Sequence, residues 1–120
     1  MLSRYKFYLA FENAQIQDYV SEKVYEGLLA GTLPVYRGTA NIAAFLPDDS
    51  FIDASELSPK TLAALLLSLA SDESRYNAYF DFKNKPLAKS LSTLANQSYC
   101  HPSALCRLCS YYAQTRPQPQ

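Results

Sequence analysis

Four polar residues near the start of the sequence have side chains suited to binding a phosphorylated ligand. Lys23 falls near the start of a stretch with helical spacing, where helix-start N–H groups and its ammonium could together hold a phosphate. Glu22 can accept hydrogen bonds from the vicinal hydroxyls of a ribose. Tyr19 offers a hydroxyl or a ring, and Asn13 both a donor and an acceptor. Together they suggest a site for a nucleotide-like anion.

Each of these side chains also has a plainer structural interpretation. Lys23 would then be a solvated surface lysine, and Glu22 would offset the positive end of the helix dipole. Tyr19 would merely pack against its surroundings, and Asn13 would bond its own loop backbone. The residue types and their spacing leave both interpretations open.

The elements that must position these residues are a strand, a loop and a helix. Alternating aromatic residues predict a strand over Lys6–Phe11, and the polar stretch Glu12–Asp18 predicts a loop. We expect Asp18 to cap the following helix and Gly31 to end it. The buried stripe of that helix is formed by Val20, Val24, Gly27 and Leu28.

Further along, strands and helices alternate, which predicts an α/β fold with a parallel sheet. Short strands are expected at Leu33–Tyr36 and Ser50–Ile52, with helical turns over Ile42–Leu46. Helices should begin near Pro59 and Ser71, the second ending at Pro86. Three strands are fewer than a complete doubly wound domain has, so we expect a partial Rossmann-like sheet with flanking helices. Residues 1–87 would form this domain, and residues 88–120 a helical or loop tail.

Composition limits the classes of function. Basic and acidic side chains balance at 11 each, so nothing indicates a nucleic-acid partner or an anionic membrane surface. No apolar run approaches the roughly 18 residues of a membrane span. The opening Met1–Lys6 leads directly into a strand pattern, leaving no room for a signal peptide, so any targeting segment or membrane anchor should lie outside this chain.

No metal site is expected. Asp48 and Asp49 follow Pro47 without other ligands at suitable spacing and are interpreted as solvated turn carboxylates. Zinc bound by the three late cysteines and the histidine is disfavoured because two of the four ligands are adjacent in sequence. Those four residues are Cys100, His101, Cys106 and Cys109.

The ordered motifs of the chain resemble the signature of the α1,3-fucosyltransferases, glycosyltransferase family 10. The match runs well over Tyr5–Lys83 and more loosely over the tail. Its central part is Tyr5–Asn13 followed by Asp18–Lys23. The other matching features, at similar spacing, are Gly31–Tyr36, Gly38, Asn41, Pro47, Ser50–Ile52 and the pair Cys106 and Cys109.

The resemblance implies the C-terminal half of a GT-B enzyme, the half that binds GDP-fucose as donor substrate. The family's diphosphate-binding lysine falls on Lys23 and its ribose-binding glutamate on Glu22, with Tyr19 and Asn13 as further donor contacts. Arg37 and Asn41 would border the donor site. GT-B enzymes stabilise the leaving diphosphate with helix dipoles and basic side chains, so no cofactor is expected.

The resemblance also implies what this chain should not contain. The catalytic base and the site for a glycan acceptor of the N-acetylglucosamine type are expected on a missing N-terminal domain, so no catalytic residue is assigned here. Glu12 is interpreted as structural. The family implies a Golgi enzyme anchored in the membrane, and in such an oxidising compartment Cys106 and Cys109 would form a disulfide.

Two other functions stay open on the sequence. The chain could be a catalytically inactive remnant that serves as a nucleotide-binding or interaction module. It could also bind a different sugar nucleotide.

Overall fold

The computed structural model describes residues 2–86 and 91–93. The chain divides into two compact units, Met1–Leu87 and Ala88–Gln120, and every element named below belongs to the first. The division into a partial Rossmann-like domain over residues 1–87 and a tail over residues 88–120 remains a prediction. Within the second, 91–93 are helical, and the late cysteines with their expected disulfide lie outside the described residues.

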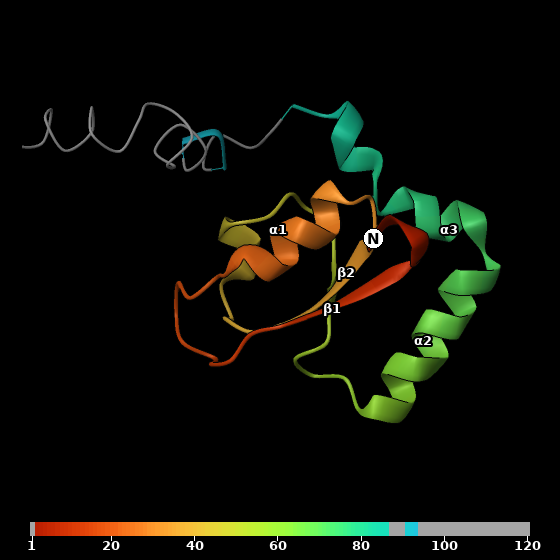
Figure 1. The fold of residues 1–120 in the computed structure, drawn as a ribbon, viewed down its shortest axis with the longest axis horizontal. Helices are drawn as coiled ribbons and strands as arrows, with labels where there is room; N and C mark the ends of the chain where they lie inside the picture. The colour runs from red at the N-terminus through yellow and green to blue at the C-terminus, as the bar shows by residue number, and fades with distance from the viewer. Residues whose placement is uncertain (1, 87–90, 94–120) are drawn as a thin grey trace, which may run out of the picture. The chain divides into compact units, whose positions relative to one another are not determined.

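Three strands, three α-helices and short 3₁₀-helices alternate along residues 2–86 (Figure 1). No helix in this part is long and apolar enough to cross a membrane. The strands are β1 (Phe7–Phe11), β2 (Leu33–Arg37) and β3 (Ile52–Asp53). The α-helices are α1 (Glu22–Leu29), α2 (Pro59–Ser71) and α3 (Glu73–Ala78), and the 3₁₀-helices are Leu2–Arg4, Ile42–Ala44 and Asp81–Asn84.

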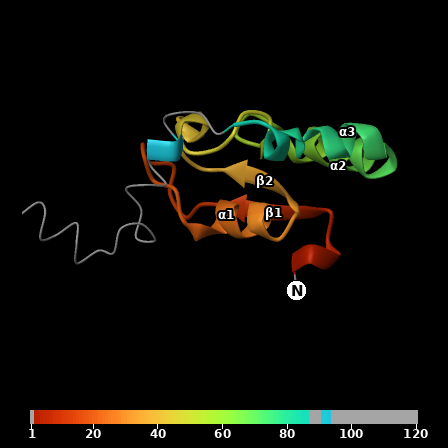
Figure 2. The same ribbon diagram turned by 90° about the horizontal axis from the view of Figure 1, so that it is seen from above.

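The three strands form one parallel sheet in the order β1-β2-β3, which confirms the predicted α/β class. Phe7 pairs with Leu33 at one end of β1, and Phe11 with Arg37 at the other. Helix α1 covers one face of the sheet, and α2 with α3 cover the other (Figure 2). Because the strands are parallel, their carboxyl ends lie at the same edge of the sheet. A ligand of an open α/β fold would bind at that edge.

Alternate residues of β2 enter two separate hydrophobic clusters, because successive side chains of a strand point to opposite faces. Tyr36 joins the cluster beneath α1, whereas Leu33 and Val35 join the cluster beneath α2 and α3. All three are fully buried, as expected for the middle strand. The first cluster contains Ala10, Val24, Tyr36, Ile42 and Leu46, and the second Leu33, Val35, Ile52, Ala54 and Leu69.

Helix α1 begins later than predicted. Ser21, and not Asp18, is its N-cap, with the Ser21 side chain accepting the N–H of Lys23. Asp18 does not cap because it lies three residues upstream with φ +62°, and its carboxylate accepts a hydrogen bond from Asn41 instead. The assignment of Asp18 as the cap was therefore wrong, although the helix itself lies where it was expected.

Helix α1 ends at Leu29, and Gly31, the predicted stop, follows two residues later with φ +73°. The N–H of Gly31 donates to the carbonyl of Leu28 at 3.1 Å, and the N–H of Thr32 donates to that of Gly27 at 3.0 Å. These two bonds form a Schellman motif, which satisfies carbonyls that the last helical turn leaves unpaired. The chain reverses here and enters β2.

Helices α2 and α3 are fastened to the start of β1. Ser58 caps α2 ahead of Pro59. The Tyr76 hydroxyl of α3 donates to the carbonyl of Lys6, directly before β1, at 2.7 Å. The Lys6 ammonium in turn donates to the carbonyl of Ala70 at 2.9 Å. Helix α3 ends at Ala78, earlier than the predicted stop at Pro86, and Asp81–Asn84 form a separate 3₁₀-helix.

Candidate functional site

The candidate site lies where β1 and β2 end and α1 begins. Glu12 directly follows β1, and its N–H donates to the carbonyl of Arg37 at 2.8 Å, which extends the strand pairing by one bond. From Glu12 the loop runs to Ser21, the cap of α1. The residues from Gly38 to Asn41 follow β2 at the same edge. Parallel strands thus bring two segments far apart in the sequence to one place.

The buried carboxylate of Glu12 is the centre of this site. Its side chain is 0% exposed and accepts hydrogen bonds on both oxygens. Oε1 accepts the Ser21 N–H at 2.8 Å, and Oε2 accepts the Ser21 hydroxyl at 2.7 Å. The Lys23 ammonium lies 3.3 Å from Oε2. Glu12 therefore closes the loop onto the helix cap and pairs with the first lysine of α1.

The Glu12–Lys23 pair changes the protonation of both groups. Burial alone would raise the pKa of Glu12, but hydrogen bonds from Ser21 and the nearby Lys23 charge outweigh it and hold that pKa below 4.5. Desolvation would lower the pKa of Lys23, but Glu12 and the neighbouring Glu22 and Tyr19 raise it above its ordinary value. Both groups are consequently charged near neutral pH.

Lys23 is held at the helix start while still reaching solvent. Its side chain is 28% exposed, and its ammonium donates to the Ser21 hydroxyl oxygen at 3.1 Å and to Glu12. An ammonium has three hydrogens, so these contacts leave one for an outside anion. The first-turn N–H groups of a helix lack intrahelical partners and favour anions. This corner can therefore hold a phosphate.

The other predicted donor contacts surround Lys23 unevenly. Tyr19 and Glu22 lie close enough to influence the Lys23 pKa, and both are exposed, Tyr19 by 40%. Asn13 is exposed at the beginning of the loop. The structure thus groups Tyr19, Glu22 and Lys23 at the helix start, with Asn13 at the other end of the same loop.

The two predicted border residues differ in their surroundings. Arg37 is exposed at the end of β2, and its carbonyl accepts the N–H of Glu12. Asn41 is engaged with the loop: its amide nitrogen donates to the Asp18 carboxylate at 2.7 Å. The amide oxygen of Asn41 accepts the Asp18 N–H at 3.2 Å. Asn41 thus organises the loop that carries Tyr19.

The chain passes unusually close to itself at Gly38. A Cβ added there would lie 2.5 Å from Cζ of Tyr36 and 2.7 Å from Cγ of Glu12. The buried Tyr36 hydroxyl accepts the N–H of Thr39 at 3.1 Å. Only a residue without a side chain lets the β2 end, the Tyr36 ring and Glu12 pack together. This close packing brings Glu12 against the chain that follows β2.

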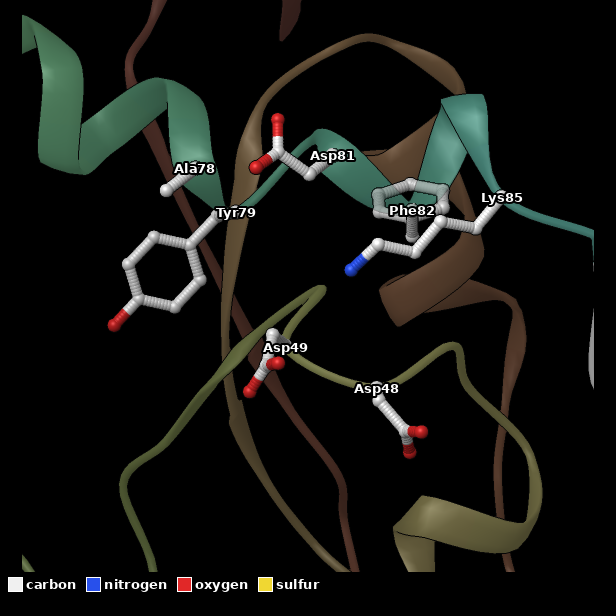
Figure 3. Close-up of a pocket in the computed structure, with 7 residues that line it drawn as sticks. All are labelled: Asp48, Asp49, Ala78, Tyr79, Asp81, Phe82 and Lys85. Carbon is white, nitrogen blue, oxygen red and sulfur yellow. The ribbon is translucent and has the colours of Figure 1, made fainter.

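A separate hollow of about 320 Å³ lies among Asp48, Asp49 and the chain from Ala78 to Lys85 (Figure 3). The Lys85 ammonium points into the space between Asp49 and Asp81. Because Asp48 and Asp49 precede β3, this hollow lies at the opposite edge of the sheet from the candidate site. Among residues 2–86 and 91–93, no group of three or more His, Cys, Asp or Glu is arranged to hold a metal.

Sequence reasoning missed the central position of Glu12 and the role of Ser21. Glu12 was interpreted as structural because its strand-end position did not show which way it points. Ser21 lies nine residues from Glu12, and no periodicity indicates that the two meet. The usable signal was local: a serine directly before a helical stretch is a common N-cap.

Comparison with known proteins places the whole chain in one family. Residues 1–120 match the family model described as glycosyltransferase family 10 (fucosyltransferase), C-terminal. GDP-fucose protein O-fucosyltransferase 3 of Bos taurus is 46% identical over 87 residues, which cover 71% of this chain and 18% of that protein. Human 4-galactosyl-N-acetylglucosaminide 3-alpha-L-fucosyltransferase FUT5 is 41% identical over 112 residues, covering 90% of this chain and 28% of the relative.

Solved structures of the family share the fold. A crystal structure of alpha1,3-fucosyltransferase with GDP-fucose superposes with a TM-score of 0.62 at 26% identity, covering 73% of this chain and 26% of that one. A crystal structure of alpha1,3-fucosyltransferase with GDP superposes with a TM-score of 0.58 at 28% identity, covering 64% of this chain and 23% of that one. The chain thus spans less than a third of the length of these relatives. It belongs to glycosyltransferase family 10, the fucosyltransferases, and corresponds to the C-terminal region of that family.

Proposed function

We propose that this chain is the donor-binding part of an inverting α1,3-fucosyltransferase and binds GDP-fucose through Asn13, Tyr19, Glu22 and Lys23. The observation that carries the proposal is the Lys23 ammonium, held by Glu12 and Ser21 at the start of α1. There the ammonium and the helix dipole act together on a diphosphate. A related structure with the same fold was crystallised with GDP-fucose, which supports the choice of ligand.

In the proposed reaction a hydroxyl of the acceptor attacks the anomeric carbon of fucose. The bond between that carbon and the diphosphate breaks, and GDP leaves with the electron pair. Lys23 and the first-turn N–H groups of α1 that Ser21 does not cap stabilise the negative charge that grows on the leaving group. The attacking hydroxyl loses its proton to a base that we assign to a part of the enzyme outside this chain. No metal or other cofactor is required for leaving-group stabilisation in this scheme.

The relatives' names support a shared donor more than a shared acceptor. One is named as a protein O-fucosyltransferase and another as acting on an N-acetylglucosaminide, yet this chain is similar to both. What such enzymes have in common is the fucose donor, and the family model matches residues 1–120, which include Lys23 and the start of α1. We propose a glycan acceptor of the N-acetylglucosamine type, bound outside this chain, and a lumenal Golgi location for the full-length enzyme.

Calorimetric titration with GDP tests the donor assignment. We expect Lys23→Ala to weaken GDP binding by roughly 10- to 100-fold, because a charge-assisted bond to phosphate is lost. Lys60→Ala is the matched control, since Lys60 is also the second residue of a serine-capped helix, α2. It should leave the affinity unchanged.

UDP serves as the control ligand in the same titration and should bind more weakly than GDP. Equal losses in the two lysine variants would overturn the assignment of Lys23. Absence of GDP binding by the unmodified chain at millimolar ligand would overturn the donor-binding function and leave the inactive-remnant interpretation.

A further inference from the structure

The loop that carries Tyr19 is tied to the segment after β2 by two hydrogen bonds between the same pair of residues. The Asn41 amide nitrogen donates to the Asp18 carboxylate at 2.7 Å, and the Asp18 N–H donates to the Asn41 amide oxygen at 3.2 Å. The two residues are 23 positions apart in sequence. We call this pair the Asp18–Asn41 latch.

The latch holds Asp18 in a backbone conformation that it would otherwise rarely adopt. Its φ is +62°, in the left-handed region that residues other than glycine disfavour, although Asp and Asn tolerate it better than most. The turn is completed by the Tyr19 N–H, which donates to the carbonyl of Ile16 at 3.1 Å. The direction in which Tyr19 leaves the turn is therefore set by the conformation of Asp18.

On its other side, the latch is anchored in the core. The Thr39 hydroxyl donates to the Asn41 amide oxygen, and the Thr39 N–H donates to the hydroxyl of Tyr36 at 3.1 Å. Both Thr39 and Tyr36 are buried. A continuous set of hydrogen bonds thus links the buried end of β2 to the residue immediately before Tyr19.

We infer that Asn41 is a positioning residue of the donor site, which acts through Asp18 to hold Tyr19 beside Lys23. The inference rests on the proposed donor-binding function of this corner. It changes the role predicted for Asn41, from a residue that borders the ligand to one that shapes the loop. The amide oxygen of Asn41 already accepts two hydrogen bonds, from Asp18 and Thr39, which is its full capacity.

A double-mutant cycle with GDP as the ligand separates positioning from direct contact. Asn41→Ala and Asp18→Ala should each raise the Kd for GDP by roughly fivefold, because the loop must be ordered again on binding. The double variant should be no weaker than either single variant, since both remove the same latch. If the two losses multiply, Asn41 acts independently of Asp18 and the inference is overturned.

A conservative variant distinguishes the latch from general loss of structure. Asp18→Asn keeps a side-chain oxygen that can accept from Asn41, and asparagine tolerates a positive φ. We therefore expect it to restore nearly the affinity of the unmodified chain. Asp18→Asn removes the charge of Asp18 but keeps the hydrogen-bonding geometry of the latch. If it binds GDP as weakly as Asp18→Ala, the latch is contradicted.

Amide hydrogen exchange without ligand keeps this inference separate from the donor-binding proposal. Breaking the latch should accelerate exchange at Tyr19 in both alanine variants, while the amides of β2 keep their protection. Unchanged exchange at Tyr19 would overturn the latch even if GDP binds. Accelerated exchange in a chain that fails to bind GDP would uphold the latch as a loop constraint and overturn only its link to the donor.

Discussion

Replacing Gly38 with alanine is expected to lower the free energy of unfolding by about 3 kcal/mol, near the upper end of overpacking effects. The added Cβ would lie 2.5 Å from Cζ of Tyr36 and 2.7 Å from Cγ of Glu12. The Tyr36 ring cannot easily move aside, because it is fully buried and packs edge-on against Phe51. Its hydroxyl also accepts the N–H of Thr39. Urea unfolding followed by circular dichroism measures the loss.

Gly31→Ala is the matched control for this prediction. Gly31 has φ +73°, but an added Cβ there would meet no atom within 4 Å. Its replacement should therefore cost only the left-handed backbone penalty, about 1 kcal/mol. If Gly38→Ala proves no more destabilising than Gly31→Ala, the close packing of Tyr36 and Glu12 around Gly38 is not present in solution.

Truncating Glu12 to alanine is expected to destabilise the chain by about 2–3 kcal/mol, because it removes the charged acceptor of several hydrogen bonds. The Ser21 N–H and hydroxyl would both lose their partner, and Lys23 would lose its counter-charge. Glu12→Gln keeps the size and one acceptor oxygen, so its effect should be smaller. Chemical denaturation at pH 7 ranks the two variants.

The pH dependence of the free energy of unfolding tests whether the charge of Glu12 causes this stabilisation. Its pKa in the folded chain is lowered from the usual 4.5, so the unfolded chain binds the proton more tightly. The stabilisation is therefore present above pH 4.5 and is lost as the pH falls through the folded-state value. Glu12→Gln should flatten this part of the stability profile. If the free energies of unfolding of the unmodified chain and of Glu12→Gln change with pH in parallel, the carboxylate contributes no such stabilisation.

Much of the fold could be predicted because its signals are local. The strand before Glu12, the stripe containing Val24, and the stop at Gly31 each follow from spacing or from one residue type. The position of Lys23 in the first turn of α1 followed in the same way. These predictions needed no knowledge of which segments meet in space.

The details that sequence reasoning missed depend on contacts between distant segments. Asp18 and Ser21 are both residue types that cap helices, but Asp18 bonds to the distant Asn41, whereas Ser21 bonds to Glu12 and caps α1. Likewise, Glu12 packs against Gly38, which directly follows the next strand, β2. The periodicity of one segment carries no information about either contact.

The most direct test of the donor-site assignment is the change in amide NMR shifts when GDP is added to the ¹⁵N-labelled chain. The account predicts that the largest changes occur at Asn13 and across Tyr19–Lys23, with smaller ones at Gly38–Asn41. Changes centred on Asp48, Asp49 and the Ala78–Lys85 segment would place the nucleotide in the hollow at the other edge of the sheet and contradict the account. No change at millimolar GDP would contradict it as well.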